Sequence, residues 1–169
     1  MRGLLRAALL GEWGFLPGPS GGATLAIGAV WPRIRAELEG LWVAPRSTRQ
    51  LDGRSARVQL AGASARVCYR IAVRRVELPA CAGLEVAAAI ATPRGTRAGD
   101  RIVGPSLGPK LGLGIARHFG RVGVIAAVEA VGRGYGTELR VDGTLLFQQF
   151  PVSGRLWLGL ELLLPARTP

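Results

Sequence analysis

The sequence lacks most of the side chains on which enzyme and metal sites depend. Among 169 residues it has one histidine (His118), two cysteines (Cys68 and Cys81) and one lysine (Lys110). Any mechanism based on histidine must use His118, and these residues are too few for a four-ligand zinc site. We therefore expect no catalytic residues, no metal, no cofactor and no enzymatic activity.

Long uninterrupted apolar runs are also missing. The chain is 49% hydrophobic but contains 25 glycines and 11 prolines, which cost a helix about 1 and about 3 kcal/mol per residue. The longest uncharged stretch, Trp13–Pro32, could span a bilayer as a helix, but its glycines and prolines indicate strand, loop and strand. The start is interpreted as a first strand rather than a signal peptide, because Arg6 interrupts its apolar region and no A-x-A site follows. An exported protein would then have a leader further upstream.

Aromatic residues make up only 6% of the chain, although the net charge is +11. A basic protein of this kind is a candidate for binding nucleic acid. However, all basic residues except Lys110 are arginine, a bias that GC-rich coding also produces, and no aromatics are interleaved with them as in a base-stacking surface. We predict no nucleic-acid partner.

What the sequence does contain is a series of segments that alternate between apolar and polar or small residues. Short turns at Trp31–Ile34, Arg74–Arg75 and Gly120–Arg121 alternate with four long connections rich in Gly, Pro and Arg. The long connections are Leu16–Gly22, Arg46–Ser55, Pro93–Ser106 and Arg133–Pro151. The eight segments are Leu5–Phe15, Ala23–Trp31, Ile34–Pro45, Ala56–Ile71, Leu78–Thr92, Pro109–Phe119, Val122–Val131 and Val152–Leu164.

Short turns on one side and long loops on the other are typical of outer-membrane barrels. The pattern predicts an all-β, eight-stranded antiparallel up-and-down transmembrane β-barrel, a single domain over residues 1–169 that closes between its first and last segments. The alternative is a soluble β-barrel or sandwich, which would place its large aliphatic side chains inside and its charges outside.

The short turns also predict which residues face each other. Residues paired across a tight turn have numbers with a constant sum and point to the same side. The sums are 65, 149 and 241 for the three turns, and 149 places Cys68 directly opposite Cys81. Opposed cysteines in an oxidising compartment form a disulfide; the alternative is two unrelated buried thiols.

Two places break the alternation. Val58 and Leu60 share a face with Ser64 and Arg66, so either a bulge near Gly62 switches the sides or the upper strand projects beyond the bilayer. The Asp142-Gly143 turn predicts that the last two strands extend as a hairpin above the membrane. Strict pairing about that turn would place the inward-facing Glu129 opposite the outward-facing Leu156, so a second bulge is expected there.

The charged residues within the strands are expected to face the lumen. An eight-stranded barrel is just wide enough for its own side chains, so opposite charges would pair and plug it; the alternative is an ion or proton path. The predicted lumen set is Arg6, Glu12, Arg35, Glu37, Glu39, Arg66, Glu85, Lys110, Glu129, Arg155 and Glu161.

A lipid-modifying Ser/His site is the strongest enzymatic alternative. His118 lies beside a short turn, whereas Ser20, Ser106 and Ser153 lie near the long loops, a membrane thickness away. Geometry decides first on a general base, so a structural histidine is expected. The Gly104–Gly112 segment lacks the order of a phosphate-binding loop and is interpreted as a loop that leads into a strand.

Four segments resemble small eight-stranded outer-membrane barrels: GFLPGPSGG, RAELEGLWVAP, RVCYRI with LPACAGLE, and GRLWLGLELLLP. The chain is most similar, over nearly its whole length, to uncharacterised barrel proteins of Gram-negative bacteria with GC-rich genomes. It departs from them at Pro165–Pro169, which follow the last strand in place of the final aromatic residue that assembly machinery recognises. That departure bears on insertion efficiency rather than on the fold.

The resemblance implies an outer-membrane location with short turns periplasmic and long loops extracellular, and partners that include outer-membrane lipid, lipopolysaccharide and the barrel-assembly machinery. The oligomeric state is left open. We expect a structural, envelope-integrity or surface-interaction role, with a narrow pore as the main alternative. Arginines of the long loops would hold lipopolysaccharide phosphates, above all the loop that carries Arg94, Arg97 and Arg101.

Overall fold

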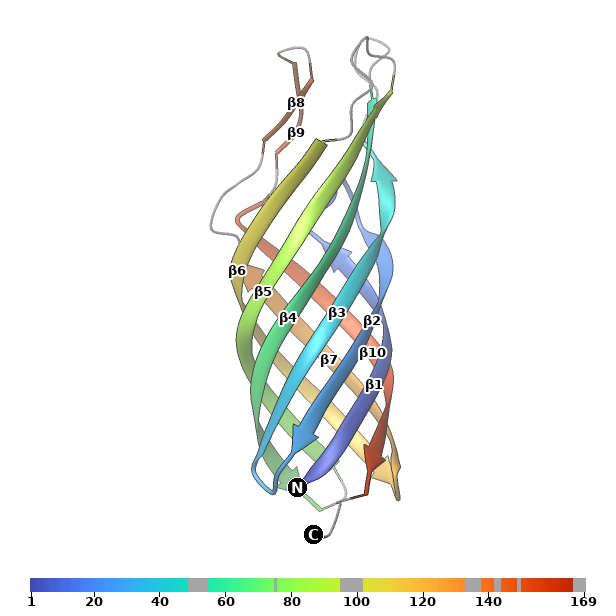
Figure 1. Cartoon of the computed structure of the whole chain (residues 1–169), viewed down its shortest axis with the longest axis vertical. Coiled ribbons are helices and arrows are strands. Elements are labelled where there is room, and N and C mark those ends of the chain that lie inside the picture. Colours follow the sequence, from blue (N-terminus) through green and yellow to red (C-terminus); the bar gives the residue numbers. More distant parts are fainter. Residues whose placement is uncertain are drawn as a thin grey trace.

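The computed structural model describes residues 1–48, 55–74, 76–94, 102–132, 138–141, 144–148 and 150–165, and these are all β or turn (Figure 1). None of the described residues forms a helix that is long and apolar enough to cross a membrane. The strands are β1 (Arg2–Trp13), β2 (Ser20–Val30), β3 (Ile34–Ser47), β4 (Ser55–Val73), β5 (Val76–Arg94), β6 (Ile102–Phe119), β7 (Val122–Gly132), β8 (Glu138–Val141), β9 (Thr144–Gln148) and β10 (Val152–Leu164).

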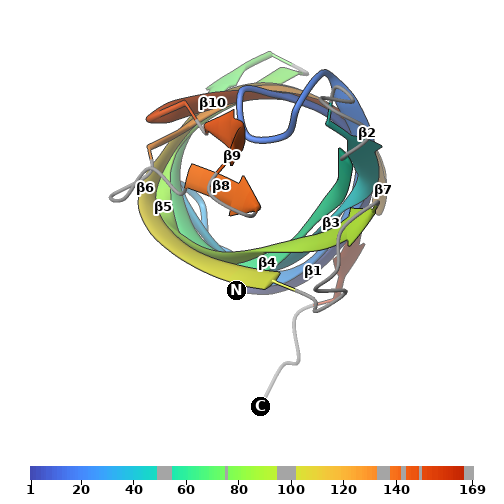
Figure 2. The same ribbon diagram turned by 90° about the horizontal axis from the view of Figure 1, so that it is seen from above.

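Eight of these strands close into a barrel, which Figure 2 shows end-on. Each strand pairs antiparallel with its neighbours in the chain, and β10 pairs with both β7 and β1. The closing ladder runs from Gly3 opposite Leu164 to Trp13 opposite Gly154. The predicted eight-stranded antiparallel barrel and its closure between the first and last segments are confirmed. The N-terminus and the end of β10 lie at the end of the barrel that carries the short turns (Figure 1).

The three predicted hairpin registers are confirmed. Gly28 pairs with Glu37 across the first short turn, and Cys68 pairs with Cys81 across the second. Gly112 pairs with Glu129 across the third. A constant sum therefore locates each ladder to the residue, because tight turns leave no freedom of register.

Burial follows the alternation, with charge inside and aliphatic side chains outside. In β3, Glu37 has 2% of its surface exposed while its neighbour Leu38 has 60%. In β10, Leu156, Leu158 and Leu160 are all more than half exposed. This arrangement is the inverse of what the soluble alternative requires, and that alternative is wrong.

Of the two explanations for the broken alternation in β4, the bulge near Gly62 is wrong. The β4–β5 ladder is unbroken from Ser55 to Val73, and the register shift between β3 and β4 lies in β3, between Val43 and Arg46. Val58 and Leu60 are buried inside the barrel on the same face as the charges. The alternation misled because the upper lumen is filled by aliphatic rather than polar side chains. At 19 residues, β4 is longer than the 9–11 that a bilayer requires.

β6 begins at Ile102, earlier than the predicted Pro109, so the preceding connection is shorter than expected. Pro105 and Pro109 lie within the strand. Within the described residues, the part of β6 before Lys110 pairs with β5 alone. Proline is tolerated where a strand has a hydrogen-bonded neighbour on one side only, which is why these residues did not end the strand.

The predicted hairpin after β7 forms as a separate two-stranded sheet, β8–β9, rather than as an extension of β7 and β10. The expected bulge is present, between Leu139 and Arg140. Below it, Arg155 pairs with Glu129, which keeps both of these side chains inside. In Figure 1 the hairpin stands above the long-loop end of the barrel. In Figure 2, which looks along the barrel, it lies within the ring of strands.

Candidate functional site: the filled lumen

Two glycines on the inner wall directly oppose glutamates on neighbouring strands, Gly28 opposite Glu37 and Gly112 opposite Glu129. A Cβ atom on Gly112 would lie 3.0 Å from Cγ of Glu129, which is tighter than ordinary van der Waals packing. A Cβ atom on Gly28 would clash with the Ala36 carbonyl oxygen and would lie 3.1 Å from Cγ of Glu37. Glycine at position 112 therefore makes room for the glutamate, whereas glycine at position 28 is required by the close approach of the β3 backbone.

The structure places all eleven residues of the predicted lumen set inside the barrel, each with at most 6% of its surface exposed. Charged groups removed from water in this way must be paired and hydrogen-bonded. Five are basic and six are acidic. They are Arg6, Glu12, Arg35, Glu37, Glu39, Arg66, Glu85, Lys110, Glu129, Arg155 and Glu161.

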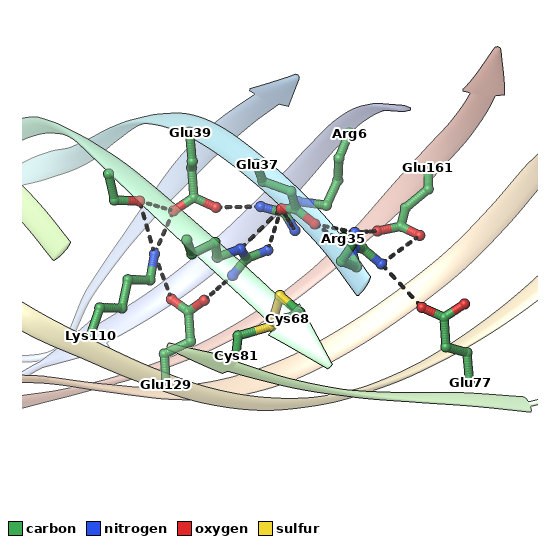
Figure 3. A network of polar contacts seen from close by, with 12 residues as sticks. Arg6, Arg35, Glu37, Glu39, Cys68, Glu77, Cys81, Lys110, Glu129 and Glu161 are labelled. Atoms are coloured by element: carbon green, nitrogen blue, oxygen red, sulfur yellow. Dashed lines mark hydrogen bonds and ion pairs between the residues drawn. A yellow bond between two sulfur atoms is a disulfide. The ribbon is translucent and has the colours of Figure 1, made fainter. Parts of the chain in front are cut away.

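Glu37 is the centre of the network (Figure 3). Its Oε2 lies 2.7 Å from Nη1 of Arg6 and accepts hydrogen bonds from Nη2 and Nε of Arg66 at 2.7 and 3.0 Å. Its Oε1 accepts a hydrogen bond from Arg35. Three guanidinium groups thus converge on one carboxylate.

Two further ion pairs, Lys110–Glu39 and Arg35–Glu161, connect strands that are not neighbours in the barrel. Nζ of Lys110, on β6, lies 2.6 Å from Glu39 on β3 and 3.0 Å from Glu129 on β7. Arg35 on β3 pairs with Glu161 on β10, from which it is separated by β2 and β1. Because β3 is hydrogen-bonded to neither β6 nor β10, its contacts with them cross the lumen.

A further brace lies nearer the long loops. Arg155 on β10 donates to both carboxylate oxygens of Glu85 on β5, at 2.9 Å for the Nη2–Oε1 contact. Below it, the indole of Trp157 lies under two guanidinium groups, with Arg6 4.3 Å and Arg66 5.1 Å from its ring centroid. Trp157 thus packs directly against the charge network.

Three polar residues were not assigned to the lumen from the sequence. Arg70 donates to both carboxylate oxygens of Glu77, at 2.8 and 2.5 Å, and Nε2 of His118 lies 3.2 Å from Glu161. Glu77 was missed because the predicted strand began at Leu78, one residue too late. The sequence contained the necessary information, because Glu77 and Cys81 are an even number of residues apart and therefore point to the same inner face of the strand.

His118 occupies the short-turn end, as the sequence predicts for a structural histidine. It pairs with Gly123, whereas Ser153 pairs with Val131, eight residues further along β7. That spacing corresponds to about 26 Å along the strand. The hydroxyl of Ser20 donates to the Ala44 carbonyl at 2.7 Å. This geometry does not assemble a nucleophile with a base.

An apolar cap fills the lumen above the charges, and sequence reasoning missed it. Phe15 and Leu16, from the loop after β1, are buried in one cluster with Leu41, Val43 and Leu60. The Phe15 amide donates to Oε1 of Glu12 at 3.0 Å. Gly14 has φ of +100°, a conformation that turns the chain inward and that glycine adopts without strain. The sequence predicted Phe15 as the last residue of the first strand, but β1 ends at Trp13, so Phe15 lies in the loop with Leu16.

Little space remains between these side chains. A cavity of about 10 Å³ lies among Arg35, Arg66, Gly112 and Trp157, which is close to the minimum for one water molecule. Across the part of the chain that the structure describes, no three His, Cys, Asp or Glu residues are grouped as they would be to hold a metal ion. Among the described residues, the lumen is a packed core of paired charges.

The predicted disulfide between Cys68 and Cys81 is present. It joins β4 and β5, and Figure 3 shows it next to the charged side chains of the lumen. The bond faces inward, since Cys68 is fully buried.

The predicted lipopolysaccharide loop falls outside this description. Arg97 and Arg101 lie outside the described residues, and Arg94 is described only as the last backbone position of β5. Nearer the barrel wall, Arg46 and Arg57 are exposed at the long-loop end of β3 and β4.

No protein-family model and no curated protein matches the chain. Its fold is nevertheless shared with solved structures. Neisserial surface protein A (NspA) and a major outer membrane protein from Thermus thermophilus each match with a TM-score of 0.65 at 14% identity; the alignments cover 95% of this chain and 95% and 99% of theirs. Ail, the attachment invasion locus protein of Yersinia pestis, solved with the heparin analogue sucrose octasulfate, matches with a TM-score of 0.59 at 13% identity, over 96% of this chain and 98% of Ail. The fold is an eight-stranded transmembrane β-barrel.

Proposed function

We propose that the protein is an outer-membrane β-barrel of a Gram-negative envelope, with a structural or surface-interaction role and with neither catalysis nor a conducting lumen. The filled lumen carries this proposal. Ion pairs between strands on different sides brace the interior, and Phe15 and Leu16 cap it at the long-loop end. A barrel built in this way acts through its outer wall and its loops.

Three observations support the outer membrane as the location. The outer wall is covered with exposed aliphatic side chains, the disulfide suits an oxidising compartment, and similarly folded structures include proteins named as surface or outer-membrane proteins. The short turns would lie in the periplasm and the long loops outside the cell, as in barrels of this layout. The assembly machinery of that membrane would insert the chain.

The purified barrel is expected to pass little or no steady current in a planar bilayer. The physical reason is that ions would have to displace buried Arg–Glu pairs and the apolar cap. Single-channel recording at low and high salt checks this. A steady current carried by one species in every insertion would establish the narrow-pore alternative instead.

The long-loop arginines are proposed to hold lipopolysaccharide phosphates by charge-assisted hydrogen bonds. Ail, which has a similar fold, was solved in complex with the heparin analogue sucrose octasulfate, and this supports an anionic ligand for a barrel of this fold. Neutralising three of them should lower co-purified lipopolysaccharide about tenfold or more, since each arginine near an anionic surface contributes about 1 kcal/mol. The substitutions are Arg94→Gln, Arg97→Gln and Arg101→Gln.

The matched control removes three charges from the opposite end, at Arg33, Arg74 and Arg121. Assay of 3-deoxy-octulosonate, a sugar of lipopolysaccharide that phospholipids lack, in barrels extracted from isolated outer membranes measures the retained lipopolysaccharide. Equal retention in the two triple variants would mean that the long-loop arginines are merely solvated.

A further inference from the structure

The short-turn end of the barrel carries a set of exposed arginines without acidic neighbours. Every Asp and Glu whose side chain the structure describes is buried. The two glutamates nearest this end, Glu77 and Glu161, are paired with Arg70 and Arg35. We call the exposed set the arginine rim; its members are Arg2, Arg33, Arg74, Arg117 and Arg121.

Hydrogen bonds to neighbouring strands hold parts of the rim in place. The Arg70 amide donates to the Arg33 carbonyl at 2.8 Å, and Nη1 of Arg70 donates to the Trp31 carbonyl at 2.5 Å. The Leu163 amide likewise donates to the Arg121 carbonyl at 2.7 Å. Arg74 has φ of 56°, a left-handed conformation in which glycine or asparagine would be less strained. The rim is presented by fixed turns.

The surroundings of Arg117 indicate where the arginine rim lies relative to the aliphatic belt of the barrel. It lies on the outer face of β6, between the exposed Ile115 and Phe119, and its guanidinium lies 5.1 Å from the centroid of the Phe119 ring. Trp31 and Tyr69 are exposed at the same end of the barrel. Aromatic rings with arginines beside them, at the edge of an aliphatic belt, mark the headgroup level of a membrane.

We infer that the arginine rim binds the phosphate groups of anionic phospholipids in the leaflet that meets the short-turn end, and so holds a charged lipid shell around the barrel. The guanidinium fork matches phosphate geometry, and the rim has no competing exposed carboxylate among the described residues. The inference rests on the membrane placement proposed above, but it does not depend on which way the barrel faces.

Native mass spectrometry of the folded barrel tests the inference. The barrel is released from nanodiscs of phosphatidylcholine containing one quarter phosphatidylglycerol, and retained lipids are counted. The wild type should keep phosphatidylglycerol in preference to phosphatidylcholine. Neutralising the whole rim with Arg→Gln substitutions should reduce that preference about tenfold or more, since one arginine near the surface changes lipid affinity about fivefold.

The matched control replaces Arg46 and Arg57, two exposed arginines on β3 and β4 at the other end of the barrel, by glutamine and should keep the preference. It is compared with the rim pair Arg33→Gln and Arg121→Gln, which should lower the preference. Equal preference in the rim variant and the wild type would overturn the inference, as would loss of preference in both variants alike. Displacement of the lipid by millimolar inorganic phosphate would also overturn it, by showing a site for free anions.

The wild type alone gives a second test in case the rim variant does not fold, which heat-dependent mobility on a gel would reveal. Its preference for phosphatidylglycerol should disappear when salt is raised to 1 M, where the Debye length is about 3 Å, and persistence at that salt would contradict a phosphate contact. This test is independent of the one for the proposed function. A barrel that conducts current would contradict the proposed function but could still retain phosphatidylglycerol.

Discussion

Replacing Glu37 by alanine is expected to lower the free energy of unfolding by about 3–5 kcal/mol, as is typical when one partner of a buried ion pair is removed. The carboxylate contacts Arg6, Arg35 and Arg66, and all four side chains are buried. The substitution would leave these guanidinium groups competing for the remaining glutamates in a medium that solvates them poorly. Urea unfolding of the refolded barrel, followed by tryptophan fluorescence, measures the change.

The amide variant Glu37→Gln is the matched control, because it keeps the shape and part of the hydrogen bonding and should be less destabilising. A double variant that also removes Arg66 should lose less than the sum of the two single variants, since each single change strands the other group. A loss below about 1 kcal/mol for Glu37→Ala would mean that the network contributes little to stability.

Replacing Phe15 by alanine is also expected to cost about 3–5 kcal/mol, the usual range for a buried phenylalanine. The side chain is fully buried and closes the lumen over Leu41, Val43 and Leu60. The variant should remain non-conducting, because the ion pairs lie below the cap. Urea unfolding and bilayer recording test the two statements separately.

Phe150→Ala offers the matched control for this substitution. It deletes the same side chain from an exposed site on the last long connection, just before β10, and it should change the stability little. Similar losses for the two variants would contradict the assignment of Phe15 as a cap. A steady current in Phe15→Ala would show that the charge network alone does not block the lumen.

The strand order, the hairpin registers and the inward face of each strand could be predicted from the sequence, because alternation and tight turns are local rules. Cys68 and Cys81 were placed opposite each other by that arithmetic alone. The partners of each charge could not be predicted. Whether Lys110 reaches Glu39 or Glu85 depends on the shear of the closed barrel, which no single hairpin encodes.

The cap was missed for a different reason. Phe15 and Leu16 lie in a connection whose path is set by Gly14 and by packing against residues far along the chain, so no periodicity marks them. Val58 and Leu60 were misread because an apolar layer and a charged layer follow each other on one strand face. A rule that expects only polar residues inside the barrel fails here, because the lumen is charged in one layer and apolar in the next.

The ladder that closes the barrel joins residue 3 to residue 164, and this separation governs how the chain can fold. Topologies dominated by such distant contacts fold slowly, since the entropy of closing a long loop must be overcome before the contacts form. Until β10 arrives, β1 presents an open row of amides and carbonyls to other chains. Protection of that exposed edge until β10 pairs with it is what the assembly machinery proposed above would have to supply.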